Sequence, residues 1–213
     1  ERAAAILPLN TPTKESVLTL DPSAAERCEI VPHFITSDQI QPRNPDDATP
    51  DRPLQIVYAG SLVMAKGLAE LLAIAQRVDD VHLTLIGQAA GKREQRYIEF
   101  FQDPRIAHRV TLTGHLPNRE VLDILVEADV YCLPSHTEGF PMSIMEAMQA
   151  GLPVVASTVG AIPDMIDEPF SVLDPYDNDG DRGWIIDPNL IIWDVALKCN
   201  HIVVLHAVFW LFF

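Results

Sequence analysis

The stretch at residues 135–157 constrains the fold of this chain more than any other. It reads Ser-His-Thr-Glu-Gly-Phe-Pro-Met-Ser-Ile-Met-Glu-Ala-Met-Gln-Ala-Gly-Leu-Pro-Val-Val-Ala-Ser. An apolar strand at 130–133 precedes it. A polar turn, a helix from about Met142 to Gly151 and a second apolar strand at 154–156 follow. Strand, loop, helix and strand form one βαβ unit, so we expect the two strands to be parallel.

The loop of this unit lies at the carboxyl end of a strand and at the amino end of a helix. Open α/β sheets bind anions there, because free N–H groups and the helix dipole both point at the ligand. Two acidic residues, Glu138 and Glu146, flank the loop. N–H groups for a phosphate and carboxylates for hydroxyls together suit a nucleotide-sugar.

Strands and helices alternate regularly after residue 54. The expected strands are 54–59, 82–86, 110–113, 130–133 and 154–156, and the expected helices are 68–78, 94–102, 118–128, 142–151 and 163–166. We expect Asn118 to cap the third of these helices. The order predicts an α/β fold, a Rossmann-like parallel sheet with helices on both faces.

Composition divides the chain into three parts. Residues 1–53 lack a clear period apart from a strand-like run at 29–32, and they end in a linker rich in Pro and Asp. Residues 54–188 form the α/β domain. Residues 189–213 are an atypical apolar tail. Three alternatives stay open for the tail: a buried strand or helix, a segment foreign to the fold, or a membrane anchor shorter than the ~20 residues that spanning requires.

Charge and cysteine content exclude several classes of function. The net charge is −15, so the basic footprint of a nucleic-acid-binding protein is absent. Three scattered cysteines, Cys28, Cys132 and Cys199, argue against a disulfide framework or a zinc site and favour a reducing compartment. We expect no signal peptide, because the apolar run that follows Glu1-Arg2 is too short. We expect a cytoplasmic protein, and peripheral association with the inner face of the membrane stays an alternative.

The central motif resembles a known family. Glu138-Gly139-Phe140-Pro141 with Glu146 makes a Glu-x7-Glu pattern, Pro134-Ser135 precedes it and Gly-Leu-Pro-Val-Val-Ala at 151–156 follows it. This combination resembles the carboxy-terminal half of a GT-B glycosyltransferase of the large retaining group called family 4, or glycosyl transferases group 1. Further matches in order are Gly60-Ser61-Leu62, Lys66-Gly67, Leu85-Ile86-Gly87, Leu116-Pro117, Ala128-Asp129-Val130 and Val159-Gly160-Ala161-Ile162-Pro163-Asp164.

The resemblance implies a site. Lys66 would place a cation on the diphosphate, Glu138 would face the donor sugar or its reacting centre, and Glu146 would accept hydrogen bonds from the ribose hydroxyls. Glu138 and Lys66 are the expected catalytic residues. The expected donor-binding residues are Gly60, Ser61, Lys66, His115, Leu116, Glu138, Gly139, Phe140, Pro141, Met142, Ser143 and Glu146. The nucleotide-sugar is a substrate, and we expect neither a cofactor nor a metal.

The sequence also departs from the family pattern. The family often carries Arg where this chain has Ser61, so one cation is missing from the first loop. Arg93 and Arg96 follow the second strand, but the sequence does not show whether they reach the site. In a GT-B enzyme the amino-terminal domain holds the acceptor, and the resemblance implies that residues 1–53 are only the end of that domain and the linker after it. We therefore expect a fragment that is inactive without that domain.

The expected reaction is hexosyl transfer, with retention, from a nucleotide-diphosphate sugar to a saccharide or lipid-linked acceptor. Two alternatives remain open. One is a non-catalytic module that keeps the nucleotide-sugar site. The other is a different enzyme on the same frame, a nucleotide-sugar epimerase or a phosphorylase.

Overall fold

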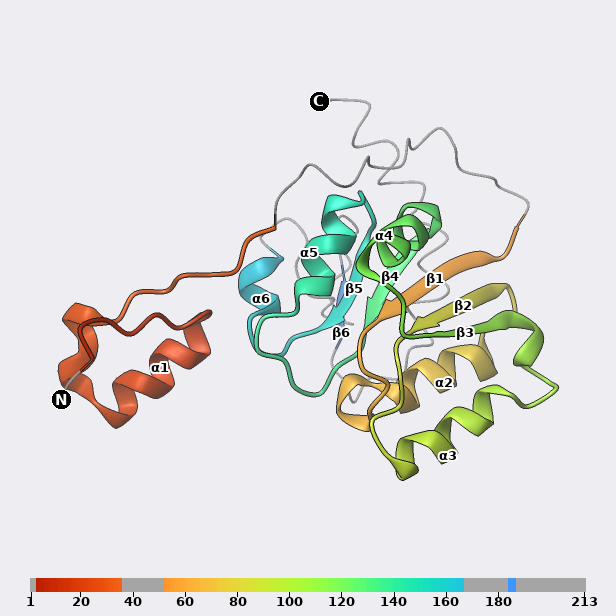
Figure 1. Ribbon diagram of the computed structural model, residues 1–213, viewed down its shortest axis with the longest axis horizontal. Helices are drawn as coiled ribbons and strands as arrows, with labels where there is room; N and C mark the ends of the chain where they lie inside the picture. The colour runs from red at the N-terminus through yellow and green to blue at the C-terminus, as the bar shows by residue number, and fades with distance from the viewer. Residues whose placement is uncertain (1–2, 36–51, 167–183, 187–213) are drawn as a thin grey trace, which may run out of the picture.

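A computed structural model describes residues 3–35, 52–166 and 184–186 of the 213-residue chain. It shows a layered α/β domain with the amino-terminal segment, residues 3–35, beside it (Figure 1).

A parallel sheet forms the centre of the α/β domain. Its six strands are β1 (Leu54–Ala59), β2 (Val81–Ile86), β3 (Val110–Gly114), β4 (Val130–Leu133), β5 (Val154–Ser157) and β6 (Trp184–Ile186). Their order is β3-β2-β1-β4-β5-β6, and every neighbouring pair is parallel. The first five strands confirm the sequence prediction, whereas β6 was not predicted. The strand order reverses between β1 and β4, where doubly wound sheets bind their ligands.

Helices cover both faces of this sheet, as predicted. They are α2 (Leu68–Arg77), α3 (Lys92–Phe101), α4 (Asn118–Glu127), α5 (Met142–Gln149) and α6 (Ile162–Met165), with short 3-10 turns η4 (Met64–Lys66) and η5 (Ala107–Arg109). Helices α2 and α3 lie on one side of the sheet, and α4 and α5 lie on the other (Figure 1). Right-handed crossovers require this division when the strand order reverses.

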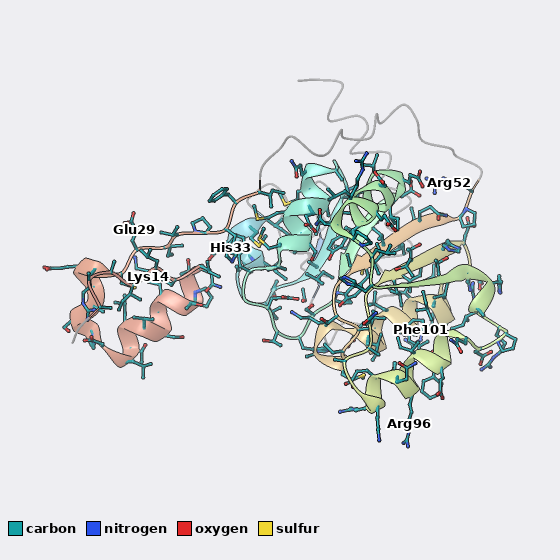
Figure 2. The ribbon with its side chains drawn as sticks, viewed as in Figure 1. Lys14, Glu29, His33, Arg52, Arg96 and Phe101 are labelled. Atoms are coloured by element: carbon teal, nitrogen blue, oxygen red, sulfur yellow. The ribbon has the colours of Figure 1, made fainter. Side chains whose placement is uncertain are left out.

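The core fills the space between the sheet and its helices. The central strands are buried on both faces, which explains their continuous apolar runs. Leu83, Leu85 and Tyr131 are fully buried, and Phe101 closes the core from α3 (Figure 2).

Asp129 anchors the amino ends of the two central strands. Its carboxylate accepts hydrogen bonds from both terminal nitrogens of Arg52 at 2.7 and 2.9 Å, and from the Gln55 N–H at 2.8 Å. Arg52 lies at the start of β1 (Figure 2). A two-pronged Arg–carboxylate pair constrains orientation as well as distance, so this pair aligns β1 beside β4.

The amino-terminal segment differs from its prediction. It holds helix α1 (Thr11–Leu20) and the 3-10 helix η1 (Pro22–Arg27), neither of which was predicted. The strand expected at 29–32 is wrong. The segment makes only an isolated bridge, Ile6 to Cys28. Pro8 explains the short pairing, because proline has no N–H with which to extend a ladder.

Several predictions fall outside the described residues: most of the linker at 42–53, the tail at 189–213, and Cys199. Within the described ranges, every helix is too short or too polar to cross a bilayer.

Candidate functional site

Three glycines bring the carboxyl ends of β1, β2 and β3 together. The Gly60 N–H donates to the Ile86 carbonyl at 2.9 Å, and the Gly87 N–H donates to the Gly114 carbonyl at 2.8 Å. A Cβ added to Gly87 would lie 1.8 Å from the Gly60 carbonyl oxygen. Only glycine permits this approach, so the loops that follow these strands start from one compact edge.

The loop between β4 and α5, residues 134–141, packs on the loop that follows β1. The His136 N–H donates to the Ala65 carbonyl at 2.9 Å. Gly67 has a left-handed φ of 81°, and a Cβ there would lie 2.2 Å from the Pro134 carbonyl oxygen. The backbones of the two loops therefore touch, and this contact brings Lys66 beside the Glu138 loop.

Glu138 and Lys66, predicted as one site from positions far apart in sequence, form a direct ion pair. Lys66 Nζ lies 2.6 Å from Glu138 Oε2 and donates to the Thr137 carbonyl at 3.3 Å. The other carboxylate oxygen accepts a hydrogen bond from Ser135 Oγ at 2.7 Å. The Glu138 side chain is only 6% exposed, whereas that of Lys66 is 30% exposed. The buried carboxylate therefore holds a lysine whose head still reaches solvent.

Helix α5 begins at Met142, as predicted, and its first turn carries no side-chain cap. Pro141 occupies the cap position and its carbonyl accepts the Ile144 N–H. Within the described residues, the N–H groups of Phe140, Met142 and Ser143 have no hydrogen-bond acceptor. These donors and the helix dipole make the amino end of α5 favourable for an anion.

Glu146 lies on α5 and is held by a neighbour that the sequence assigned differently. Asn118 Nδ2 donates to Glu146 Oε1 at 2.9 Å. The prediction that Asn118 caps α4 is wrong, because Pro117 occupies the cap position and Asn118 is the first helical residue. The amide instead orients the Glu146 carboxylate, which is half-buried.

The loops after β1 and β3 supply the remaining predicted residues. Gly60, Ser61 and His115 are exposed, and Leu116 is half-buried. The His115 side chain makes no hydrogen bond or ion pair with any described residue. A shallow pocket of about 410 Å³ lies beside these loops, and its lining includes Leu62, Gly87 and Gly114.

Two buried tyrosines support the site, and the sequence analysis missed both. The Tyr58 hydroxyl donates to the Ser61 carbonyl at 2.7 Å, and the Tyr131 hydroxyl donates to the Ala59 carbonyl at 3.1 Å. Burial, and then the charge of Glu138, raise the pKa of Tyr58 above its ordinary value of 10.0. Burial also raises the pKa of Tyr131. Both phenols thus stay protonated and can donate. Both tyrosines lie in apolar strands, and in the sequence such a position predicts only a core residue.

His136 faces α2. Its Nε2 lies 2.9 Å from Glu70 Oε1. The other oxygen, Glu70 Oε2, is buried and has no partner among the described residues. This pair links the 134–141 loop to α2, the helix that follows Lys66.

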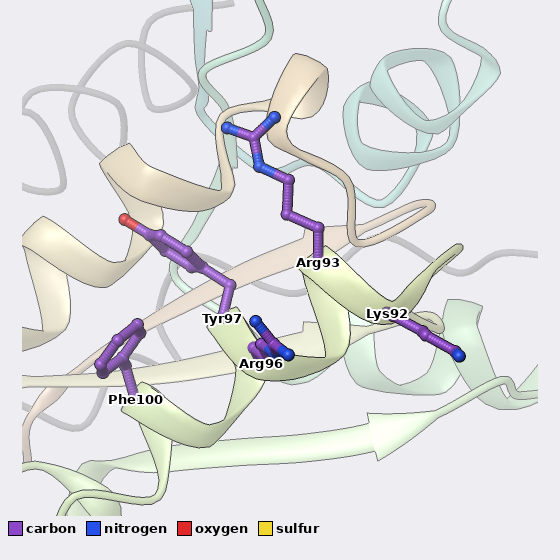
Figure 3. Close-up of a pocket in the computed structure, with 5 residues that line it drawn as sticks. All are labelled: Lys92, Arg93, Arg96, Tyr97 and Phe100. Carbon is purple, nitrogen blue, oxygen red and sulfur yellow. The ribbon is translucent and has the colours of Figure 1, made fainter.

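The cations of α3 form a separate surface. Lys92, Arg93 and Arg96 line a shallow pocket of about 440 Å³ with Tyr97 and Phe100 (Figure 3). Arg93 and Lys92 point in different directions from the helix (Figure 3). The described contacts of Lys66 and Glu138 include none of these side chains. Arg93 and Arg96 therefore make no hydrogen bond or ion pair with the predicted catalytic pair in the described part of the chain.

Comparison with known proteins identifies the family. The family model for glycosyl transferases group 1 matches residues 41–192, well over half of the chain. The chain therefore belongs to the glycosyl transferases group 1 family, as its motifs predicted.

Curated relatives carry names from this family. The chain is 28% identical over 167 residues to the phosphatidylinositol N-acetylglucosaminyltransferase GPI3 subunit of Saccharomyces cerevisiae, with 75% of the chain and 36% of the relative aligned. It is 32% identical over 152 residues to a D-inositol 3-phosphate glycosyltransferase of Corynebacterium diphtheriae, with 67% of the chain and 33% of the relative aligned. The chain thus spans about a third of the length of these relatives.

Two solved structures share the fold of this chain. The Anabaena protein Alr3699/HepE in complex with UDP-glucose matches with a TM-score of 0.75 at 17% identity, over 96% of this chain and 56% of that one. The lipopolysaccharide outer core galactosyltransferase WaaB matches with a TM-score of 0.71 at 22% identity, over 95% and 53%. These matches confirm the Rossmann-like fold class.

Proposed function

We propose that this chain is the donor-binding part of a retaining GT-B glycosyltransferase of family 4. The reaction is transfer of a hexosyl group from a nucleotide-diphosphate sugar to a saccharide or lipid-linked acceptor. The observation that carries the proposal is the convergence of Lys66 with the open amino end of α5 on the loop at residues 134–141.

The diphosphate is the part of the donor that this arrangement suits. Breaking the glycosidic bond leaves negative charge on the diphosphate, and fixed dipoles and a cation lower that barrier. Lys66 has three N–H donors. Two of them meet Glu138 and the Thr137 carbonyl, which leaves one for a phosphate oxygen. The N–H groups of Phe140, Met142 and Ser143 supply further donors without a metal.

The two carboxylates serve different parts of the donor. Glu146 accepts hydrogen bonds from the ribose hydroxyls, since a carboxylate matches a vicinal diol, and Asn118 holds it in place at 2.9 Å. Glu138 faces the sugar end of the site. Its carboxylate has about four acceptor positions, so its bonds to Lys66 and Ser135 leave room for a sugar hydroxyl or for developing positive charge.

The relatives support the class of ligand. Two relatives are named as an N-acetylglucosaminyltransferase subunit and a glycosyltransferase. The similar Anabaena structure is a complex with UDP-glucose. In a complete enzyme of this kind the acceptor lies on an amino-terminal GT-B domain. Such a domain is therefore the proposed protein partner, and this chain alone does not transfer sugar. A cytoplasmic location at the inner membrane face is consistent with a lipid-linked acceptor.

Titration calorimetry tests the donor site. We expect the chain to bind at least one of UDP, GDP and ADP, and Glu146→Ala to weaken that binding at least tenfold because ribose contacts are lost. Glu99→Ala, on the exposed side of α3, is the matched control and should bind like the wild type. Absence of binding to every nucleoside diphosphate would overturn the proposal, and sugar transfer by this chain alone would overturn the need for a partner domain.

A further inference from the structure

The Gly139 carbonyl accepts hydrogen bonds from two segments outside its own βαβ unit. Asn10 Nδ2 donates to it at 2.8 Å across 129 residues of sequence, and the Ala161 N–H donates at 3.0 Å. Gly139 is exposed, and a Cβ there would meet nothing within 4 Å. No packing around Gly139 itself fixes its carbonyl, and the two hydrogen bonds do.

Fixing a carbonyl also fixes the N–H that follows it. The peptide group is planar and trans, so the Gly139 C=O and the Phe140 N–H point in opposite directions. The Phe140 N–H has no acceptor among the described residues and lies in the loop proposed to hold the diphosphate. Glycine is conformationally permissive. Without its two donors, the Gly139–Phe140 peptide could rotate and turn this N–H away from the anion.

The Asn10 side chain is held in one orientation. Its side chain is buried, with the residue 3% exposed, and both ends of its amide are used. Asn10 Oδ1 accepts the Thr13 N–H at 2.8 Å and caps α1, while Nδ2 reaches the Gly139 carbonyl. The orientation of the amide is therefore set by α1.

Two further contacts join the amino-terminal segment to the same region. The Thr11 N–H donates to Asp164 Oδ2 on α6 at 2.9 Å. The His33 ring packs edge-on against Phe140 with centroids 5.5 Å apart. His33 lies where the extended part of the segment reaches the α/β domain (Figure 2). The segment thus holds residues 139–140 from more than one side.

We propose that Asn10 is a positioning residue for the donor site. It holds the Gly139–Phe140 peptide so that the Phe140 N–H faces the donor diphosphate, and it thereby couples the amino-terminal segment to the α/β domain. This inference rests on the proposed function, because it assumes that a nucleoside diphosphate occupies the loop.

The variant Asn10→Ser tests the inference. Serine keeps a neutral oxygen to cap α1, but its side chain is too short to donate to Gly139, and it adds no charge near the anion. Calorimetry with UDP, GDP and ADP first finds the diphosphate that the wild type binds most tightly. We expect the variant to bind that diphosphate about fivefold more weakly, and to bind the matching nucleoside, which lacks phosphate, with unchanged affinity.

A spectroscopic measurement separates positioning from general loosening. Adding the diphosphate should shift the Phe140 amide cross-peak in the ¹H–¹⁵N spectrum of the wild type, and that shift should shrink in Asn10→Ser. The control Ser16→Gly weakens α1 by helix propensity and leaves the Asn10 contacts in place. It should bind the diphosphate like the wild type. If Asn10→Ser does not fold, Asn10→Thr replaces it, since Thr also caps a helix, is too short to donate to Gly139 and adds no charge.

The outcomes are distinct. Equal diphosphate binding by wild type and Asn10 variant, equal weakening for diphosphate and nucleoside, or the same weakening in Ser16→Gly would overturn the inference alone. Failure of the wild type to bind any of the three diphosphates would overturn the proposed function, and the inference with it.

Discussion

Two loops at the carboxyl edge of the sheet are held in different ways. The loop at residues 134–141 is tied by side chains from three other segments: Lys66 binds Glu138, Glu70 contacts His136, and Asn10 donates to Gly139. In the loop at residues 114–117, Gly114 is linked through its backbone to β2, and the exposed His115 side chain has no partner among the described residues.

This difference matches two kinds of recognition. An anion is stabilised by dipoles and charges that are already fixed before it binds, so a loop that grips a diphosphate gains from many cross-links. We propose that residues 114–117 border the nucleobase through backbone contacts, and a loop with that role needs none of these cross-links. We therefore expect substitutions in the first loop to have larger effects than matched substitutions in the second.

The largest effect is expected from two glycines with similar φ angles: Gly160, which follows β5 and packs on the loop at residues 134–141, and Gly114 in the second loop. Gly160 (φ 61°) would place a Cβ 2.1 Å from the Glu138 carbonyl oxygen, whereas a Cβ on Gly114 (φ 71°) would meet nothing within 4 Å. Gly160→Ala should lower the free energy of unfolding by about 3–5 kcal/mol, and Gly114→Ala by about 1–2 kcal/mol. Urea unfolding measures both, and equal losses would remove the difference between the two loops.

The next effect concerns Lys66, the cation that binds Glu138 in the loop at residues 134–141. Lys66→Gln keeps a donor for Glu138 but removes the charge, and it should weaken nucleoside diphosphate binding about 30-fold. Lys92→Gln removes the same charge from the surface of α3 and is the matched control. Calorimetry on both variants decides whether the site of the anion is the loop or α3.

A smaller effect, on the free energy of unfolding, is expected for Tyr58 at high pH. The pKa of folded Tyr58 is raised above the ordinary 10.0, chiefly by burial and then by Glu138. The unfolded tyrosine therefore loses its proton first, and the stabilisation present below pH 10 is lost as pH rises above it. Between pH 10 and 11 the loss should be about 1 kcal/mol greater in the wild type than in Tyr58→Phe. Parallel stability profiles of the two proteins would contradict this coupling.

The smallest effect is expected at Asn118. Asn118→Ala removes the donor to Glu146, on the exposed side of the site. Because Glu146 stays in place on α5, diphosphate affinity should fall only about twofold to threefold. A loss as large as that of Glu146→Ala would mean that Asn118 itself contacts the nucleotide.

The α/β domain could be predicted from sequence because its signals are local. Apolar runs ended by glycine mark β1 and β2, and helical spacing of Leu68, Leu71 and Leu72 marks α2. Helix α1 could not be found by this means, since it has no buried residue and hence no apolar face. Its only local signals are Asn10 before it and Pro12 in its first turn.

The site was predicted as a set of residues but not as a set of contacts. The motifs brought Lys66 and Glu138 to one site, yet their ion pair spans 72 residues and depends on the Gly67–Pro134 contact, which no periodicity reveals. The same holds for Asn10 and Gly139. Contacts between distant segments require the folded backbone, whereas the residue types at the end of a strand do not.

A crystal structure of this chain with the nucleoside diphosphate that it binds most tightly tests directly where the donor diphosphate binds. We expect the diphosphate to lie at the amino end of α5, with phosphate oxygens within hydrogen-bond distance of Lys66 Nζ and the Phe140 N–H, and with the ribose on Glu146. A diphosphate bound instead to Lys92, Arg93 and Arg96 on α3 would contradict it.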